Sequence, residues 1–297
     1  MIRTDLAAEA AAYYRETDGR TPEGVRVQEY RRQGYAVTRV DVDDDCGAAA
    51  IGKPRGRYLT VELDALLHRE SQSFARASMA IAEELRPLLP RDAADPVMVA
   101  GIGNAAITPD AIGPEAVRHT MVTRHMIARM PREFAAFRPV AAVCPGVPGT
   151  TGVETAELLR GVVERVRPAA MIVVDALASR RMARVCRTVQ IADTGLSPGS
   201  GVGGDSIPLS RDTFGIPVIA LGVPTVVDSL TLTIDTLLDV GQSIPEEVQL
   251  RRDHDRMIVT PRDIDARVAE LGKLLGYALN LALHPGLTME DMELYLA

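Results

Sequence analysis

The strongest constraint on the fold is a series of short apolar runs that alternate with helical segments between residues 97 and 240. The runs cover residues 97–101, 140–143, 171–174 and 216–223, and most contain β-branched residues. Continuous apolar runs of this length are typical of strands buried on both faces, and their alternation with helices favours right-handed βαβ units. The 297 residues are therefore predicted to form a single α/β domain, with a mostly parallel central sheet flanked by helices.

Two of these runs lead to an aspartate. Asp175 directly follows Met171-Ile-Val-Val174, and Thr108-Pro-Asp110 lies shortly after the run at 97–101. Open α/β sheets bind their ligands at the carboxyl ends of the strands, so we expect Asp110 and Asp175 to form a pair there. The intervening Gly101-Ile-Gly-Asn104 lacks the third glycine of a dinucleotide-binding fingerprint, so no such cofactor is predicted.

A close pair of carboxyl groups has a defined chemistry. Two neighbouring carboxylates do not both ionise cheaply, so one pKa rises and the pair shares a proton. One group then activates water while the other protonates a leaving group, as in hydrolysis of a peptide or glycoside without a metal. Two alternatives stay open on pattern alone. The pair binds a divalent metal together with a histidine or waters, or each aspartate only caps a following helix or turn.

Composition narrows the class of protein. The net charge of −7 disfavours a nucleic-acid-binding surface, which is usually basic. Three widely spaced cysteines give no disulfide framework and fit a reducing compartment. The first residues are polar and do not resemble a signal peptide, and no apolar run approaches the roughly 20 residues of a membrane span. We therefore expect a cytoplasmic protein without direct nucleic-acid or membrane partners.

Several other segments have a predicted role. Residues 35–42 and 58–63 are predicted strands, and residues 73–89, 115–130, 154–166, 224–239, 263–283 and 288–296 are predicted helices. Gly52-Lys-Pro-Arg-Gly-Arg57 is interpreted either as a hairpin turn or as a grip for an acidic group of a partner. The glycine-rich stretch 193–204 is interpreted as a loop over the sheet edge that contacts substrate. It begins with Asp193-Thr-Gly, a weak match to the aspartic protease tripeptide.

Long motifs across nearly the whole chain resemble those of the germination protease family of spore-forming bacteria, endopeptidases that degrade small acid-soluble spore proteins. The matching stretches are Ile2-Arg-Thr-Asp-Leu-Ala7, Ile51-Gly-Lys-Pro-Arg-Gly-Arg-Tyr-Leu-Thr60, Thr108-Pro-Asp-Ala-Ile-Gly-Pro114, Val122-Thr-Arg-His125, Pro145-Gly-Val-Pro-Gly-Thr-Thr-Gly-Val-Glu-Thr155, Asp175-Ala-Leu-Ala-Ser-Arg180, Pro198-Gly-Ser-Gly-Val-Gly203 and Ile216-Pro-Val-Ile-Ala-Leu-Gly-Val-Pro-Thr-Val-Val-Asp228.

The resemblance implies an atypical aspartic endopeptidase whose fold is similar to that of the hydrogenase maturation proteases. Its two essential aspartates match Asp110 and Asp175. It further implies a homotetramer, made as a zymogen in the forespore, that cuts after an acid and before an apolar residue and Ala. Asp5-Leu6-Ala7 has this pattern, so the bond between Asp5 and Leu6 is the expected processing site and residues 1–5 a short propeptide. No cofactor and no required metal are expected.

Two departures from the family pattern qualify these expectations. Relatives carry a longer prosegment than residues 1–5, which weakens the expected zymogen control. The connection at 242–256 is shorter than the insertion of many relatives, which puts a tetramer or substrate contact there in doubt. Sequence leaves open which aspartate is the base. It also leaves open a metal-dependent hydrolase of the same fold and a non-catalytic binder of spore proteins.

Overall fold

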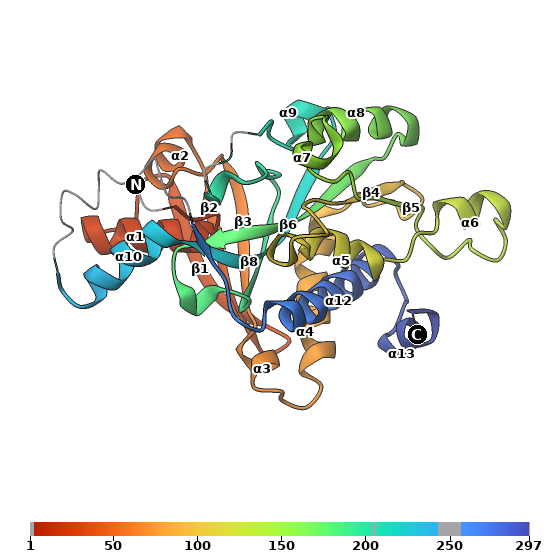
Figure 1. Ribbon diagram of the computed structural model, residues 1–297. Coiled ribbons are helices and arrows are strands. Elements are labelled where there is room, and N and C mark those ends of the chain that lie inside the picture. Colours follow the sequence, from red (N-terminus) through yellow and green to blue (C-terminus); the bar gives the residue numbers. More distant parts are fainter. Residues whose placement is uncertain (1–2, 203, 205, 243–256, 297) are drawn as a thin grey trace.

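The computed structural model describes residues 3–202, 204, 206–242 and 257–296. Its centre is one sheet with the strand order β1-β2-β3-β7-β8-β6-β4-β5, and β9 pairs with the end of β8. Figure 1 shows this sheet crossing the molecule with helices on either side of it. The predicted α/β domain is therefore confirmed. No helix among the described residues is long and apolar enough to cross a membrane.

The sheet is mixed, with a parallel and an antiparallel half, so the predicted mostly parallel pairing holds only for the parallel half. Parallel pairing joins β5 (Val140–Val143), β4 (Val97–Gly101), β6 (Ala170–Ser179) and β8 (Val218–Asp228). Antiparallel pairing joins β8 to β7 (Thr188–Ala192), then to β3 (Gly56–Glu62), β2 (Tyr35–Val42) and β1 (Val25–Arg32), and also β8 to β9 (Ile258–Val259). The link from β6 to β7 holds only the 3-10 helix η3 (Met182–Arg184), too short for a crossover, so β7 runs back against its neighbours.

Helices cover both faces of the sheet. One core unites sheet residues with α4 (Ser73–Leu85), α5 (Ile112–Arg118) and α12 (Ile264–Leu283). The other unites the opposite face with α1 (Ala7–Asp18), α2 (Asp45–Ile51) and α8 (Thr155–Val166). The remaining helical elements are α3 (Asp64–Leu67), η1 (Arg86–Leu88), η2 (Thr108–Asp110), α6 (Arg124–Arg129), α7 (Pro148–Thr151), η4 (Ser200–Val202), α9 (Arg211–Phe214), α10 (Ser229–Asp239) and α13 (Met289–Leu296).

Alternation along β6 fixes which way its side chains point. Ile172 and Val174 belong to the core with α4, α5 and α12, whereas Met171 and Val173 belong to the core with α1 and α8. Because successive side chains of a strand point to opposite faces, Asp175 points to the face that carries α1 and α8. The N-terminal segment reaches the same face, since Ala7 and Ala8 pack in that core.

Several boundaries differ from the sequence prediction. The predicted helix at 115–130 is broken into α5 and α6. The helix predicted from residue 224 begins only at Ser229, because β8 continues through Pro224 to Asp228. Asp175 also differs from the prediction, because it lies within β6 rather than at the end of a strand. Strand β1 was not predicted, because its exposed residues are mostly polar. The connection at 242–256 lies outside the described residues apart from Gln242.

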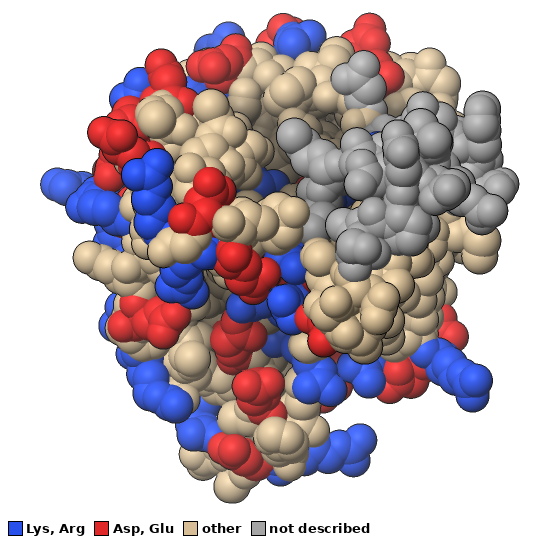
Figure 2. All heavy atoms as spheres, turned by 90° about the vertical axis from the view of Figure 1, so that its left-hand side faces the viewer, with Lys and Arg blue, Asp and Glu red and all other residues tan. Residues whose placement is uncertain are grey.

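Charged side chains are mixed over the surface that carries the N-terminal half. Figure 2 shows this face, with Lys and Arg intermingled with Asp and Glu. One exposed ion pair of the N-terminal half joins Arg26 and Asp43 at 2.7 Å. Exposed pairs of this kind add little to stability, so their role here is mainly in solubility.

Candidate active site

Asp175 is held in the sheet beyond the end of a neighbouring strand. Strand β4 pairs with β6 only as far as Val174, so the side of β6 that β4 covers is open from Asp175 onward. On its other side, β6 is paired with β8, where Asp175 is opposite Gly222, and Gly222 is in turn opposite Gln190 of β7. Residues opposite one another point to the same face, so the side chains of Asp175 and Gln190 flank a glycine on the α1 side.

Asp110 ends the short 3-10 helix η2, whose Pro109 suits the first turn. One of its carboxylate oxygens, Oδ2, accepts a hydrogen bond from the backbone N–H of Asn104 at 2.7 Å. The helix is fixed to the sheet because the hydroxyl of Thr225 on β8 donates to the carbonyl of Pro109 at 2.6 Å. The short helix formed by Thr108-Pro-Asp110 is thus fixed by hydrogen bonds, and it positions the carboxylate of Asp110 near the edge of the sheet.

The two carboxyl groups line the same pocket, which has a volume of about 360 Å³. Its walls are largely apolar and include Ile102, Ile107 and Leu177. Asp175 is buried, with 4% of its surface exposed, whereas Asp110 is half-buried. The structure therefore brings together the two aspartates that the sequence nominated.

Burial raises the pKa of both carboxyl groups. Burial raises the pKa of Asp175 well above its usual range, the negative charges of Asp110 and Asp5 raise it further, and the N–H of Ala176 opposes the rise. Burial also raises the pKa of Asp110, against a hydrogen bond from the N–H of Asn104. Such a pair holds one proton more readily than two isolated aspartates do.

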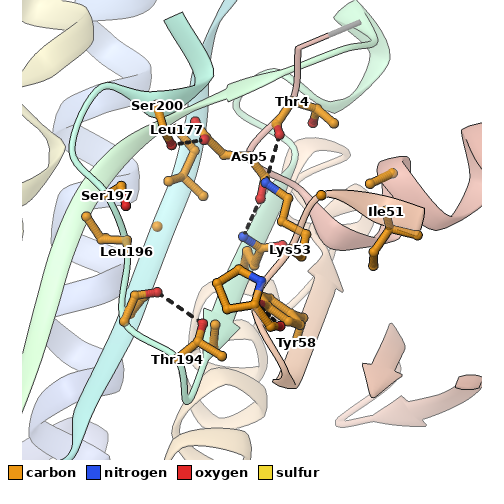
Figure 3. Close-up of a pocket in the computed structure, with 18 of the residues that line it drawn as sticks. Thr4, Asp5, Ile51, Lys53, Tyr58, Leu177, Thr194, Leu196, Ser197 and Ser200 are labelled. Atoms are coloured by element: carbon orange, nitrogen blue, oxygen red, sulfur yellow. Dashed lines mark hydrogen bonds between the residues drawn. The ribbon is translucent and has the colours of Figure 1, made fainter. Parts of the chain in front are cut away.

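A third carboxylate in the same pocket comes from the chain's own N-terminus. Asp5 lines this pocket and also a neighbouring cavity of about 1100 Å³, which Asp175 lines as well. The backbone N–H of Asp5 donates to the carbonyl of Ala178 at 2.8 Å, and the N–H of Ala178 donates to Oδ2 of Asp5 at 2.8 Å. The hydroxyl of Ser200 donates to Oδ1 at 2.8 Å, a contact visible in Figure 3.

The backbone around Asp5 is held just as closely. Nε2 of Gln190 donates to the carbonyl of Asp5 at 2.9 Å, and Oε1 of the same side chain accepts from the N–H of Ala7 at 2.8 Å. Nζ of Lys53 donates to the carbonyl of Thr4 at 2.9 Å, and Figure 3 shows its side chain reaching toward this segment. The main chain on both sides of the Asp5–Leu6 bond therefore has hydrogen-bond partners.

Two further anchors fix this segment to the sheet. The side chain of Leu6 is completely buried. The carboxylate of Glu9, itself buried, accepts from the backbone N–H groups of Arg180 at 2.6 Å and Arg181 at 3.0 Å, just after β6. The first turn of α1 is thus tied to the end of the strand that carries Asp175.

Sequence reasoning found some of these groups and missed others. Asp110, Asp175, Asp5 and Leu6 were nominated. Lys53 lay in a stretch interpreted as a hairpin turn or as a contact for an acidic group of a partner, but this stretch connects α2 to β3, and Lys53 donates to a main-chain carbonyl of the same chain. Gln190 was not nominated, and Ser200 was included only as part of the stretch 193–204. The sequence could have pointed to Gln190, because it places an amide inside the apolar run of β7 and a buried amide needs hydrogen-bond partners.

Metal-dependent or thiol chemistry would need other groups in the part of the chain that the structure describes. No set of three or more His, Cys, Asp and Glu side chains there is arranged to hold a metal ion. The three cysteines are free, and Cys186 is buried while Cys46 and Cys144 are exposed. Asp193, of the tripeptide that resembles aspartic proteases, is exposed and accepts a hydrogen bond from the N–H of Arg57 at 2.8 Å.

Comparison with known proteins bears on the whole chain. The model of the germination protease family matches residues 3–256. A germination protease of Clostridium tetani is 40% identical, with 99% of each chain covered, and one of Caldanaerobacter subterraneus is 39% identical, covering 98% of this chain and 97% of that one. Among solved structures, a NiFe hydrogenase maturation protease of Thermococcus kodakarensis is 16% identical over 62% of this chain and 92% of that chain, with a TM-score of 0.34. By its sequence over nearly its full length, the chain is a member of the germination protease family of peptidases.

Proposed function

We propose that the protein is an endopeptidase that starts the degradation of small acid-soluble spore proteins, with Asp110 and Asp175 as its catalytic pair. The observation that carries this proposal is the shared pocket, in which both carboxyl groups lie beside a segment of peptide chain around Asp5. Membership of the germination protease family supports the substrate class. The protein then acts in the forespore or spore core, as a homotetramer made in zymogen form.

The unequal burial of the two aspartates suggests their roles. Asp175, almost fully buried and next to a second carboxylate, is the protonated partner, and half-buried Asp110 is the ionised one. Asp110 takes a proton from water, whose oxygen attacks the carbonyl carbon of the substrate. Asp175 then gives its proton to the leaving nitrogen as the C–N bond breaks. Transfer of the proton from Asp110 to Asp175 restores the starting state.

The preferred substrate has an acid before the cut bond and an apolar residue and Ala after it. Asp5-Leu6-Ala7 has this pattern, and Asp5 lines the pocket with both aspartates. We therefore propose that the Asp5–Leu6 bond is the processing site and that residues 1–5 are released as a short propeptide. Until release, this segment competes with other peptides for the site.

The test uses a peptide with an Asp-Leu-Ala core, incubated with the purified full chain and analysed by mass spectrometry. Wild-type protein should cut after Asp, while Asp110→Asn and Asp175→Asn should give no product although their circular dichroism is unchanged. Asp64→Asn is the matched control and should keep its activity, because Asp64 is exposed and lines neither of the two cavities. Full activity of Asp175→Asn contradicts the proposal.

Two other functions give different results in the same assay. A non-catalytic binder of spore proteins forms a complex with the peptide but yields no product at any pH. A metal-dependent hydrolase loses activity on exhaustive chelation and regains it with a divalent metal, whereas the two-aspartate mechanism keeps its rate. Light scattering of the same samples measures the mass of the assembly and so tests the tetramer.

A further inference from the structure

Three groups around Asp5 belong to neither carboxylate of the pair, yet each contacts a distinct atom next to the expected cut. Ala178 and Ser200 donate to the two side-chain oxygens of Asp5, one to each. Gln190 donates to its main-chain carbonyl. The side chain and the carbonyl of one residue are thus held by separate donors.

The space around the Asp5 carboxylate is fitted to it. A Cβ atom on Gly201 would lie 2.1 Å from Oδ2 of Asp5 and 2.7 Å from Cβ of Ala178. Gly201 is itself buried in the 3-10 helix η4. The absence of a side chain at residue 201 is therefore what leaves room for an acid. Two direct donors in such a confined place favour a carboxylate over an amide, because both oxygens of a carboxylate accept, whereas the nitrogen of an amide only donates and would face the N–H of Ala178 or the hydroxyl of Ser200.

The side chain of Gln190 forms hydrogen bonds with the main chain of Asp5 and Ala7. It is 7% exposed and lies in the same row of the sheet as Asp175, with only Gly222 between them. Its Nε2 contacts the carbonyl of Asp5 and its Oε1 contacts the N–H of Ala7, so one amide spans the Asp5–Leu6 bond and the bond after it. A donor on the carbonyl oxygen of a bond under attack becomes more favourable as negative charge develops there.

We propose that Gln190, Ser200 and the N–H of Ala178 form the subsite that recognises the residue before the cut bond, with Gln190 also stabilising the oxyanion. Ser200 and Ala178 bind the acidic side chain, and Gly201 sets the size of the subsite. When the water oxygen bonds to the carbonyl carbon, the carbonyl π electrons move to the oxygen, and Nε2 of Gln190 donates to that oxyanion. The charge returns to the C=O bond as the C–N bond breaks. This inference rests on the proposed endopeptidase function.

The experiment measures kcat and KM for two peptides, Arg-Thr-Asp-Leu-Ala-Ala-Glu and its variant with Asn in place of Asp. In wild type, kcat/KM should be about tenfold or more higher for the Asp peptide. Ser200→Ala should reduce this preference toward one by lowering the rate for the Asp peptide alone. Ser71→Ala, at an exposed position that lines neither cavity, is the control and should keep the preference. Gly201→Ala should abolish cleavage of the Asp peptide, since its Cβ fills the position of the carboxylate.

Gln190→Leu should lower kcat for both peptides by about 100-fold to 1000-fold with little change in KM, as expected for a donor used mainly in the transition state. Gln28→Leu, the same substitution at an exposed position of β1, controls for the change in side chain. If Gln190→Leu is unfolded by circular dichroism, Gln190→Asn replaces it, because the shorter amide does not reach the same carbonyl.

The results separate this inference from the function on which it rests. If wild type cuts, Asp175→Asn does not, and both Ser200→Ala and Gln190→Leu match wild type, the subsite is wrong while the endopeptidase stands. A rise in KM alone for Gln190→Leu contradicts the oxyanion role. If wild type cuts neither peptide at any pH, the proposed function is overturned and the subsite with it.

Discussion

The raised pKa of Asp175 makes a quantitative prediction about stability. An acid whose pKa is higher in the folded than in the unfolded protein binds more protons when folded. Its contribution is therefore complete below the unfolded pKa, about 3.9, and is lost as the pH rises toward the folded pKa. The rate of loss is about 1.4 kcal/mol per pH unit for one proton. Because burial and Asp110 raise the pKa of Asp175 well above its usual range, this loss should continue until the pH passes the folded pKa.

Asp175→Asn removes this dependence, since the amide does not titrate. The unfolding free energy of the variant minus that of wild type should therefore rise with pH from about pH 4, by up to about 1.4 kcal/mol per unit, and level off above the folded pKa. Any change in packing or hydrogen bonding adds only an offset independent of pH. The slope belongs to the pair, because Asp110 titrates against the same charge.

The assay is urea unfolding followed by circular dichroism at pH 4 to 8 and constant ionic strength, with wild type shown by mass spectrometry to be intact. Asp64→Asn, an exposed aspartate at the start of α3, is the matched control. A difference between Asp175→Asn and wild type that does not change with pH would refute the reasoning. It would mean that Asp175 is not a buried acid held protonated by its surroundings.

Three substitutions test how the site is held. Leu6→Ala should cost about 2–5 kcal/mol in urea unfolding, because Leu6 is completely buried, and a loss below 1 kcal/mol would show that its contacts are dispensable. Gly113→Ala should destabilise the fold and abolish peptide cleavage, since its Cβ would lie 2.5 Å from the carbonyl of Val174, and normal activity would contradict this packing. Thr225→Val should lower the free energy of unfolding by about 1–3 kcal/mol, because it leaves the carbonyl of Pro109 unpaired. Unchanged stability and kcat would show that η2 keeps its place without this hydrogen bond.

Local pattern predicted the parallel half of the sheet well. Strands β4 and β5 have the bounds that their apolar residues indicated, and so does the alternating strand β2 of the antiparallel half. The antiparallel half was harder to predict from the sequence. Strand β1 has mostly exposed polar residues, and β7 and β8 pair because tertiary packing brings them together, which no local pattern indicates. Proline at residue 224 suggested a helix start, but β8 passes through it to Asp228.

The sequence by itself determined the α/β class, the two aspartates and the family, because each depends on residues that are contiguous in the chain. Only the tertiary structure decided that Asp110 and Asp175 share a pocket, that Asp5 lies in it, and that Gln190 and Ser200 contact Asp5 from distant positions. The physical reason is that these groups meet across strands β6, β8 and β7 and the loop after β7. Their register is set by pairing and core packing on both faces of the sheet, which local patterns do not encode.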